Sequence, residues 1–178
     1  MPKWIIDPDH SVAEFSIRYL TIAHVRGIFG AVTGVIDFDP SDPTRLAVEA
    51  RIDVTSVRTG NSKRDAHLAT ADFFDAAKYP EIIFRSTGVE LVGGSRFRLS
   101  GELAMHGVTR PVKLDCEFAG PVKIPEAIGG ETSIGFMCTT CLNREEFGIT
   151  WGITPMQGGI MAAGEVQVML DVEADLQG

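Results

Sequence analysis

Apolar and polar side chains alternate with a period of two along most of this chain. Between residues 11 and 19, the side chains of Ala13, Phe15 and Ile17 fall on one face, and those of Glu14 and Arg18 fall on the other. Only an extended strand sends successive side chains to opposite faces, because a helix repeats every 3.6 residues. The alternation predicts strands over residues 11–19, 28–38, 46–54, 82–91, 96–105, 112–118, 133–142 and 165–176.

About eight strands, each with one apolar face, are typical of a sheet that closes on itself. We therefore predict an all-β fold built on an antiparallel barrel with an apolar interior. Closure removes the unpaired edges that invite aggregation, and Gly27, Gly30 and Gly34 suit bends in a coiled strand. A barrel of this size commonly stays undivided, so residues 1–178 are expected to form one domain.

Two segments interrupt the alternation. Residues 61–79 carry polar residues at spacings typical of helix starts, such as Ser62 before Asp65. They predict one or two short helices that cover an end of the barrel. Residues 143–159 begin with Asn143 and a glutamate three residues later, and they predict a long loop with apolar side chains of its own.

Composition narrows the classes of partner. The chain carries a formal net charge of −8 with its basic residues scattered, which argues against nucleic acid, since binding to phosphates needs clustered Lys and Arg. No apolar stretch is long enough for an integral membrane segment. The odd set of Cys116, Cys138 and Cys141 gives no disulfide framework. Because no export signal is visible, the chain is expected in the cytoplasm, or in the periplasm or outside the cell if a leader was removed.

The spacings of the histidine and cysteine residues indicate neither a metal site nor a redox-active pair. No pair of histidines has the spacing of metal ligands, so no metal is expected, and His106 is expected in a hairpin. Cys138 and Cys141 form a C-x-x-C, but positions three apart on a strand point to opposite faces. Cys138 is therefore expected to act as a small hydrophobic residue. The histidines are His10, His24, His67 and His106.

Arg64, Asp65 and His67 bring a cation, an acid and a base within four residues. One interpretation is helix capping and packing against the barrel. The other is a polar gate over the barrel mouth, where a cation would hold an acidic or hydroxyl head group.

Large apolar side chains recur on the predicted inner faces. Alternation cannot distinguish a filled interior from a cavity, because barrels of about eight strands exist in both forms. The candidates are Phe15, Phe38, Phe84, Phe97, Phe118, Phe136, Met105 and Met161.

Several motifs, in order along nearly the whole chain, resemble the YceI-like family of lipocalin-like barrels that bind polyisoprenoids. Tyr19 and Ala69 depart from the family pattern, which often has a histidine and a basic residue there, so head-group preference is expected to differ where these positions contact a ligand. The motifs are Trp4 to Ser11, Val25 to Gly30, Thr59 to Asn61, Arg64 to Leu68, Asp72 to Phe74, Tyr79-Pro80, Gly101 to Leu103, His106 to Val112, Asn143-Arg144 and Phe147-Gly148.

The resemblance implies a lipocalin-like barrel around a long isoprenoid or fatty-acyl chain, often in a homodimer, with no established catalysis and no cofactor besides the lipid. A non-catalytic lipid carrier is therefore the favoured function. Two alternatives stay open: an enzyme acting on a lipid head group through His67, Asp65 or His106, and a dimeric structural module with a packed barrel. No catalytic or metal-binding residue is expected. The residues expected to contact the ligand are Phe15, Ile17, Phe29, Phe38, Phe84, Phe97, Leu99, Phe136, Trp151, Met161, Arg64 and His67.

Overall fold

Long antiparallel strands make up most of the protein in a computed structural model, which describes residues 1–152, 155–156 and 159–178. One α-helix and three short 3₁₀ segments join them. The strands are β1 (Lys3–Ile6), β2 (Val12–Tyr19), β3 (Ala23–Phe29), β4 (Val32–Asp37), β5 (Ala47–Asp53), β6 (Val57–Arg58), β7 (Glu81–Gly93), β8 (Arg96–Met105), β9 (Val108–Lys123), β10 (Thr132–Asn143), β11 (Pro155–Met156), β12 (Gly159–Ile160) and β13 (Ala162–Leu176). The helical elements are η1 (Val54–Ser56), α1 (Ser62–Leu68), η2 (Glu126–Ile128) and η3 (Arg144–Phe147).

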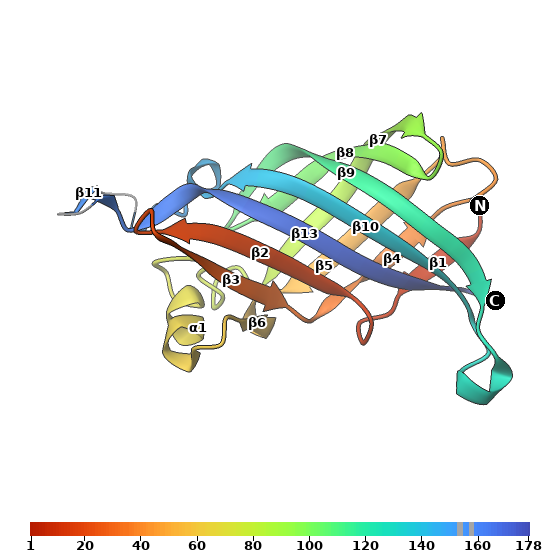
Figure 1. Cartoon of the computed structure of the whole chain (residues 1–178), viewed down its shortest axis with the longest axis horizontal. Helices are drawn as coiled ribbons and strands as arrows, with labels where there is room; N and C mark the ends of the chain where they lie inside the picture. The colour runs from red at the N-terminus through yellow and green to blue at the C-terminus, as the bar shows by residue number, and fades with distance from the viewer. Residues whose placement is uncertain (153–154, 157–158) are drawn as a thin grey trace.

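Eight strands form a closed antiparallel ring in the order β1, β4, β5, β7, β8, β9, β10 and β13. The ring closes where the end of β13 pairs with β1, with Trp4 opposite Leu176. An earlier stretch of the same edge of β13 pairs with β2, which carries β3 and β6 with it. Figure 1 shows α1 and β11 at one end of this barrel and both chain termini at the other. The predicted antiparallel barrel of about eight strands is confirmed.

The predicted strand over residues 28–38 is wrong in its bounds. The chain leaves β3 at Phe29 and begins β4 at Val32, and between them the amide of Ala31 donates to the hydroxyl of Ser56. This corner separates two strands with different neighbours, because β3 pairs with β2 and β4 pairs with β1.

The segment after β6 contains one helix, α1, where the sequence predicted one or two. Asn61 caps it, with its side-chain oxygen accepting from the amide of Arg64 at 3.0 Å. The residues that follow fold back instead of starting a second helix, because the amide of Phe74 donates to the carbonyl of Leu68. Asn143 caps η3, but its side-chain oxygen accepts from the amide of Glu145 at 3.0 Å and not from that of the glutamate three residues on, so a 3₁₀ turn begins at the predicted cap residue.

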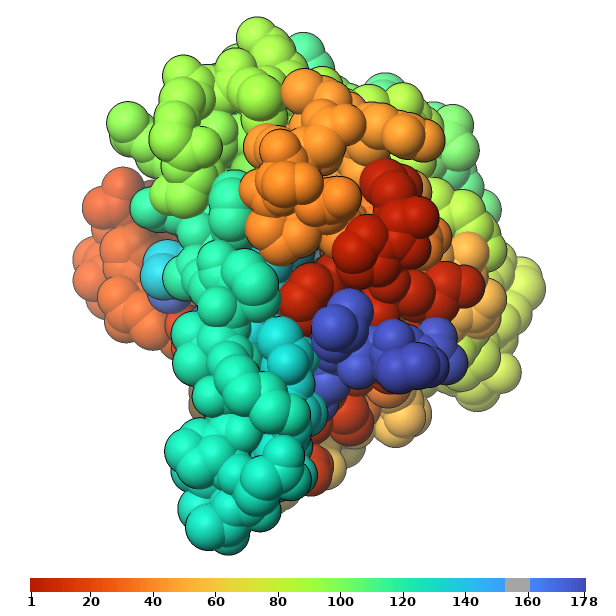
Figure 2. Space-filling view, turned by 90° about the vertical axis from the view of Figure 1, so that its right-hand side faces the viewer, coloured from red at the N-terminus to blue at the C-terminus, as the bar shows by residue number. Residues whose placement is uncertain are grey.

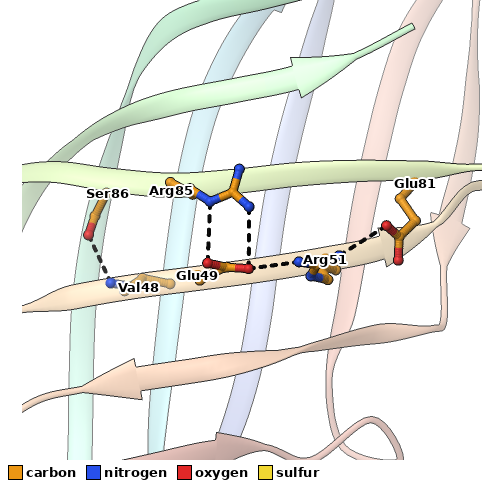
Figure 3. A network of polar contacts seen from close by, with 6 residues as sticks. All are labelled: Val48, Glu49, Arg51, Glu81, Arg85 and Ser86. Carbon is orange, nitrogen blue, oxygen red and sulfur yellow. Dashed lines mark hydrogen bonds and ion pairs between the residues drawn. The ribbon is translucent and has the colours of Figure 1, made fainter. Parts of the chain in front are cut away.

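The outer face of the barrel is polar, as the alternation predicts. On β5, Glu49 accepts from Arg51 at 2.9 Å and from Arg85 of β7 at 3.2 Å, and Arg51 also contacts Glu81 at 3.2 Å (Figure 3). Hydrogen bonds from the guanidinium of Arg51 and then Arg85 lower the pKa of the Glu49 carboxyl. The side chains are 41–54% exposed, so these ion pairs define which face meets water more than they stabilise the fold.

The end of the barrel that carries the termini is packed shut. Trp4 and Phe38 are 2% and 0% exposed, and the Trp4 indole donates to the carbonyl of Phe38 at 2.8 Å. The Phe38 ring lies 5.1 Å from that of Phe118 and 5.4 Å from that of Phe136, edge to face. Figure 2 looks onto this end and shows it covered by the N-terminal segment, the C-terminus, and the segments next to β4 and after β9.

Cys116 and Cys138 form a disulfide, which the sequence did not predict. Cys116 of β9 lies directly opposite Cys138 of β10 in the register, and both are buried on the inner face. The prediction that Cys138 and Cys141 point to opposite faces is confirmed, since Cys141 is exposed and unbonded. The buried pair thus cross-links two neighbouring strands from inside the barrel.

Replacing both bonded cysteines (Cys116→Ala with Cys138→Ala) is expected to lower the free energy of unfolding by about 3 kcal/mol in oxidising buffer. The bond spans a sequence separation of 22, and it removes loop-closure entropy from the unfolded chain. Urea unfolding with and without reductant measures the change. Cys141→Ala is the control and should alter stability by less than about 0.5 kcal/mol. Coincident curves for the double variant and the unaltered protein would contradict the cross-link.

Candidate functional site

The barrel encloses a cavity of about 660 Å³ whose walls are almost entirely apolar. The inward-facing side chains of the strands make these walls, and α1 with the turn after it lies over one end. The packed-barrel alternative requires a filled interior, and this barrel is hollow. Its apolar walls include Ile6, Ala13, Phe15, Ile17, Phe29, Ile36, Val48, Ala50, Ile52, Ile82, Phe84, Phe97, Leu99, Leu103, Met105, Leu114, Phe136, Cys138, Val168, Leu170 and Val172.

Two phenylalanines of the wall lie against glycines of the neighbouring strand. Phe15 of β2 is opposite Gly27 of β3, where a Cβ atom would come within 2.4 Å of the phenyl ring. Phe84 of β7 covers Gly101 of β8 with the same 2.4 Å approach. The missing side chains leave room for the rings to lie along the wall, which keeps the cavity open.

Aromatic side chains from the turn after α1 line the other end of the cavity, which we call the mouth. Phe74 reaches the barrel wall, with its ring 5.5 Å from that of Phe29 and edge to face with it. Phe73 packs 5.1 Å from Trp151, and the His67 ring stands edge-on to both, at 5.1 and 4.9 Å. This aromatic cluster joins α1 to the loop after η3.

Polar groups of α1 also line the mouth. Arg64 donates from Nε to the Thr59 hydroxyl at 2.8 Å and from Nη2 to the Thr59 carbonyl at 2.7 Å. Asp65 accepts from the amide and hydroxyl of the same threonine, which fixes the helix against the end of β6. His67 contacts Asp72 at 2.7 Å, with side chains 39% and 53% exposed. Arg64 and His67 therefore bind segments next to the helix, and both side chains also line the mouth.

Eleven of the twelve residues expected to contact a ligand line this cavity. The exception is Phe38, which lies in the packed end and is fully buried. Tyr19, one of the two departures from the family pattern, also lines the cavity, whereas Ala69 does not. The eleven are Phe15, Ile17, Phe29, Phe84, Phe97, Leu99, Phe136, Trp151, Met161, Arg64 and His67.

The sequence-based list omitted several residues of the lining, among them a buried arginine. Arg144, the first residue of η3, is 5% exposed and lines the cavity near Ile149 and Ala162. It follows the cap residue Asn143 in a polar stretch, so its sequence context indicates an exposed loop side chain. Burial of this arginine depends on how the chain returns from η3 to β13.

Two other candidate chemical groups lie away from the cavity lining. His106 stands in the β8–β9 hairpin, as predicted, and its Nδ1 lies 2.9 Å from the carbonyl of Phe147. Asp7, His10 and Glu173 bring ligand atoms within 4.8 Å of one another, an approach that histidine spacing did not indicate. The hydrogen bond to Asp7 raises the pKa of His10, which is exposed.

Comparison with known proteins gives one family. A family model described as a YceI-like domain matches residues 4–174. A UPF0312 protein of Pseudomonas savastanoi is 34% identical over 148 residues, covering 82% of this chain and 76% of that protein. Among the described residues, no helix is long and apolar enough to cross a membrane.

Two solved structures share the fold. The crystal structure of Burkholderia cenocepacia BcnA superposes with a TM-score of 0.81 at 21% identity, covering 94% of this chain and 98% of that chain. A polyisoprenoid binding domain from Saccharophagus degradans, implicated in plant cell wall breakdown, superposes with a TM-score of 0.72 at 16% identity, covering 98% of both chains. At these identities the similarity establishes the barrel architecture.

The contact between Phe15 and Gly27 predicts a sensitive position in the cavity wall. Gly27→Ala places a Cβ atom within 2.4 Å of the Phe15 ring, so the ring must move into the cavity. We expect a loss of about 1–3 kcal/mol in the free energy of unfolding, measured by urea titration. Gly30→Ala is the matched control, because nothing lies within 4 Å of a Cβ there. Equal effects of the two variants would contradict this account of the wall.

Proposed function

Because this chain belongs to the YceI-like domain family, we propose that it is a non-catalytic carrier that encloses a long isoprenoid or related lipid chain in its barrel. The apolar cavity of about 660 Å³ is the observation that carries the proposal. The resemblance in fold to a polyisoprenoid binding domain supports it. No covalent bond to the ligand is required.

Burial of hydrocarbon would supply enough free energy for binding. A chain of roughly twenty carbons at about 0.8 kcal/mol per methylene gives a gross transfer free energy near 16 kcal/mol. Ordering of the chain and loss of its free motion subtract several kcal/mol or more. The remainder is consistent with tight but reversible binding, as a carrier needs.

The mouth would hold the polar part of the ligand. Arg64 and His67 line it with Trp151, and the Nη1 group of Arg64 makes no hydrogen bond within the described part of the chain. We propose that the tail lies along Phe15, Phe84 and the other aromatic side chains of the wall.

Catalysis on the head group has less support than binding. Of the three proton carriers considered, His67 alone lines the cavity. Asp65 accepts two hydrogen bonds from Thr59, and His106 is turned to the carbonyl of Phe147. These contacts give Asp65 and His106 structural roles, so a non-catalytic protein is the simpler proposal.

Protein purified from its own source is expected to carry lipid. Organic extraction followed by mass spectrometry should release a species of defined chain length in a near-stoichiometric amount. The variant Ala50→Phe fills the cavity from β5 and should reduce bound lipid severalfold or more. Ala47→Phe places the same ring on the outer face of that strand, where Ala47 is exposed, and should leave lipid content unchanged. Extracts with no defined lipid, or equal loads in the two variants, would count against the proposal.

We further propose that two copies of the chain associate, as the family resemblance implies. Met137 of β10 and Met169 of β13 are 56% and 42% exposed on neighbouring strands, and a second copy would cover them. Light scattering at micromolar concentration should give twice the chain mass, and Met137→Glu with Met169→Glu should give the single chain mass. A monomer in the unaltered protein would refute the association.

For the cellular location we propose the cytoplasm, with an oxidising compartment as the alternative. The sequence favours the cytoplasm, whereas a disulfide such as Cys116–Cys138 is typical of an oxidising compartment. Cells quenched in acid, whose proteins are then alkylated in denaturant, distinguish them: one labelled thiol per chain indicates an oxidising compartment, and three indicate the cytoplasm.

A further inference from the structure

Arg144 is a buried cation at the mouth of the lipid cavity. It is 5% exposed and its side chain lines the cavity. Its Nε donates to the carbonyl of Ala163 at 2.8 Å, its Nη2 to that of Ala162 at 2.9 Å and its Nη1 to that of Ile149 at 3.3 Å. These bonds anchor the guanidinium between η3 and the start of β13.

The charge of Arg144 has no anionic partner in the described part of the chain. None of the ion pairs there includes it. Glu145 acts on it only through space and is itself exposed. Burial lowers the pKa of Arg144 from its ordinary value, but an arginine stays protonated in proteins. A buried, unneutralised cation is unfavourable unless something compensates it.

The guanidinium also retains hydrogen-bonding capacity. An arginine has five N–H groups, and the three bonds to carbonyls use one each on Nε, Nη1 and Nη2. One N–H on Nη1 and one on Nη2 are therefore left over. These two remaining donors on one cation are enough for a charge-assisted hydrogen bond to each of two oxygens of a carboxylate or a phosphate.

Other cationic groups line the same cavity. Lys63 and Arg64 belong to its lining, and Glu14 is the one acidic residue among the lining residues described. The mouth is thus locally positive, although the whole chain carries a formal net charge of −8. An anion that enters the cavity would meet attraction there and a strongly anchored donor in Arg144.

We propose that Arg144 binds the anionic head group of the ligand, a carboxylate or a phosphate, and so selects acidic lipids over neutral ones. The inference rests on the proposed lipid-binding function and adds the head-group class to it. Arg144 then has two roles, since the same guanidinium joins η3 to β13 and neutralises the ligand.

Competition binding with single-chain lipids tests whether the protein prefers acidic head groups. The neutral fluorophore N-phenyl-1-naphthylamine is bound first and then displaced by hexadecanoic acid, hexadecyl phosphate or hexadecan-1-ol, which share one tail and differ in the head. In the unaltered protein, at least one anion should displace the probe at concentrations about tenfold or more below those of the alcohol. The acid and phosphate arms identify which anion is preferred.

Variants of Arg144 separate charge from anchoring. Arg144→Gln should remove the preference for anions and leave the affinity for the alcohol within about twofold. Arg144→Lys keeps the charge and should keep most of the preference. Lys113→Gln, exposed on β9 between the lining residues Val112 and Leu114, is the control and should change neither. If Arg144→Gln no longer binds the fluorophore, the test rests on Arg144→Lys. Loss of the preference for anionic lipids in the lysine variant would then overturn the proposal.

Two results would overturn the role of Arg144 while leaving lipid binding intact. One is equal affinity of the unaltered protein for the acid, the phosphate and the alcohol. The other is an anion preference that persists in Arg144→Gln. Failure of the fluorophore and of all three lipids to bind would instead refute the proposed function, and the head-group site with it.

Discussion

Closure of the sheet at β13 is the constraint on which the rest of the structure depends. One edge of this strand pairs first with β2 and then, from Ala174 to Leu176, with β1. Because the ring is complete, every strand gains a face sealed from water, and alternation places the apolar side chains there. Eight strands enclose more space than these side chains fill. Trp4 and Phe38 pack one end, and the remaining volume is the cavity.

Features that depend on local periodicity could be predicted from the sequence. The strands at residues 46–54, 96–105 and 133–142 and the inward direction of Phe84, Phe97 and Phe136 follow from alternation alone. Residues 23–27 of β3 were missed because Gly27 has no side chain to mark the inner face, and that gap accommodates Phe15. Whether the interior was full or hollow could not be read from the pattern, since both arrangements place the same residues inside.

Features that depend on strand register, or on contacts between segments distant in sequence, could not be predicted. Cys116 and Cys138 meet because β9 and β10 pair with those two residues opposite each other, after an irregularity between Ser133 and Gly135. A slip of one residue would have moved one thiol to the outer face. Arg144 is buried because the carbonyls of Ala162 and Ala163 come back to it from β13, and nothing in its sequence neighbourhood indicates that contact.

The two ends of the cavity differ in a way that orients a lipid. The closed end offers only apolar side chains, whereas Lys63, Arg64 and Arg144 line the part near α1. Transfer of a hydrocarbon tail from water is most favourable into the apolar closed end. A polar head group loses least hydration free energy by staying at the mouth, so the tail would enter first. The His67–Asp72 contact that ties α1 to its turn is half-exposed, and such pairs are worth at most about 1 kcal/mol. That contact lies within α1 and its own turn, whereas the segment over the mouth is held to the rest of the barrel by the contacts of Phe74 with Phe29 and of Phe73 with Trp151. Exchange of a ligand at this end would therefore require these aromatic contacts to open.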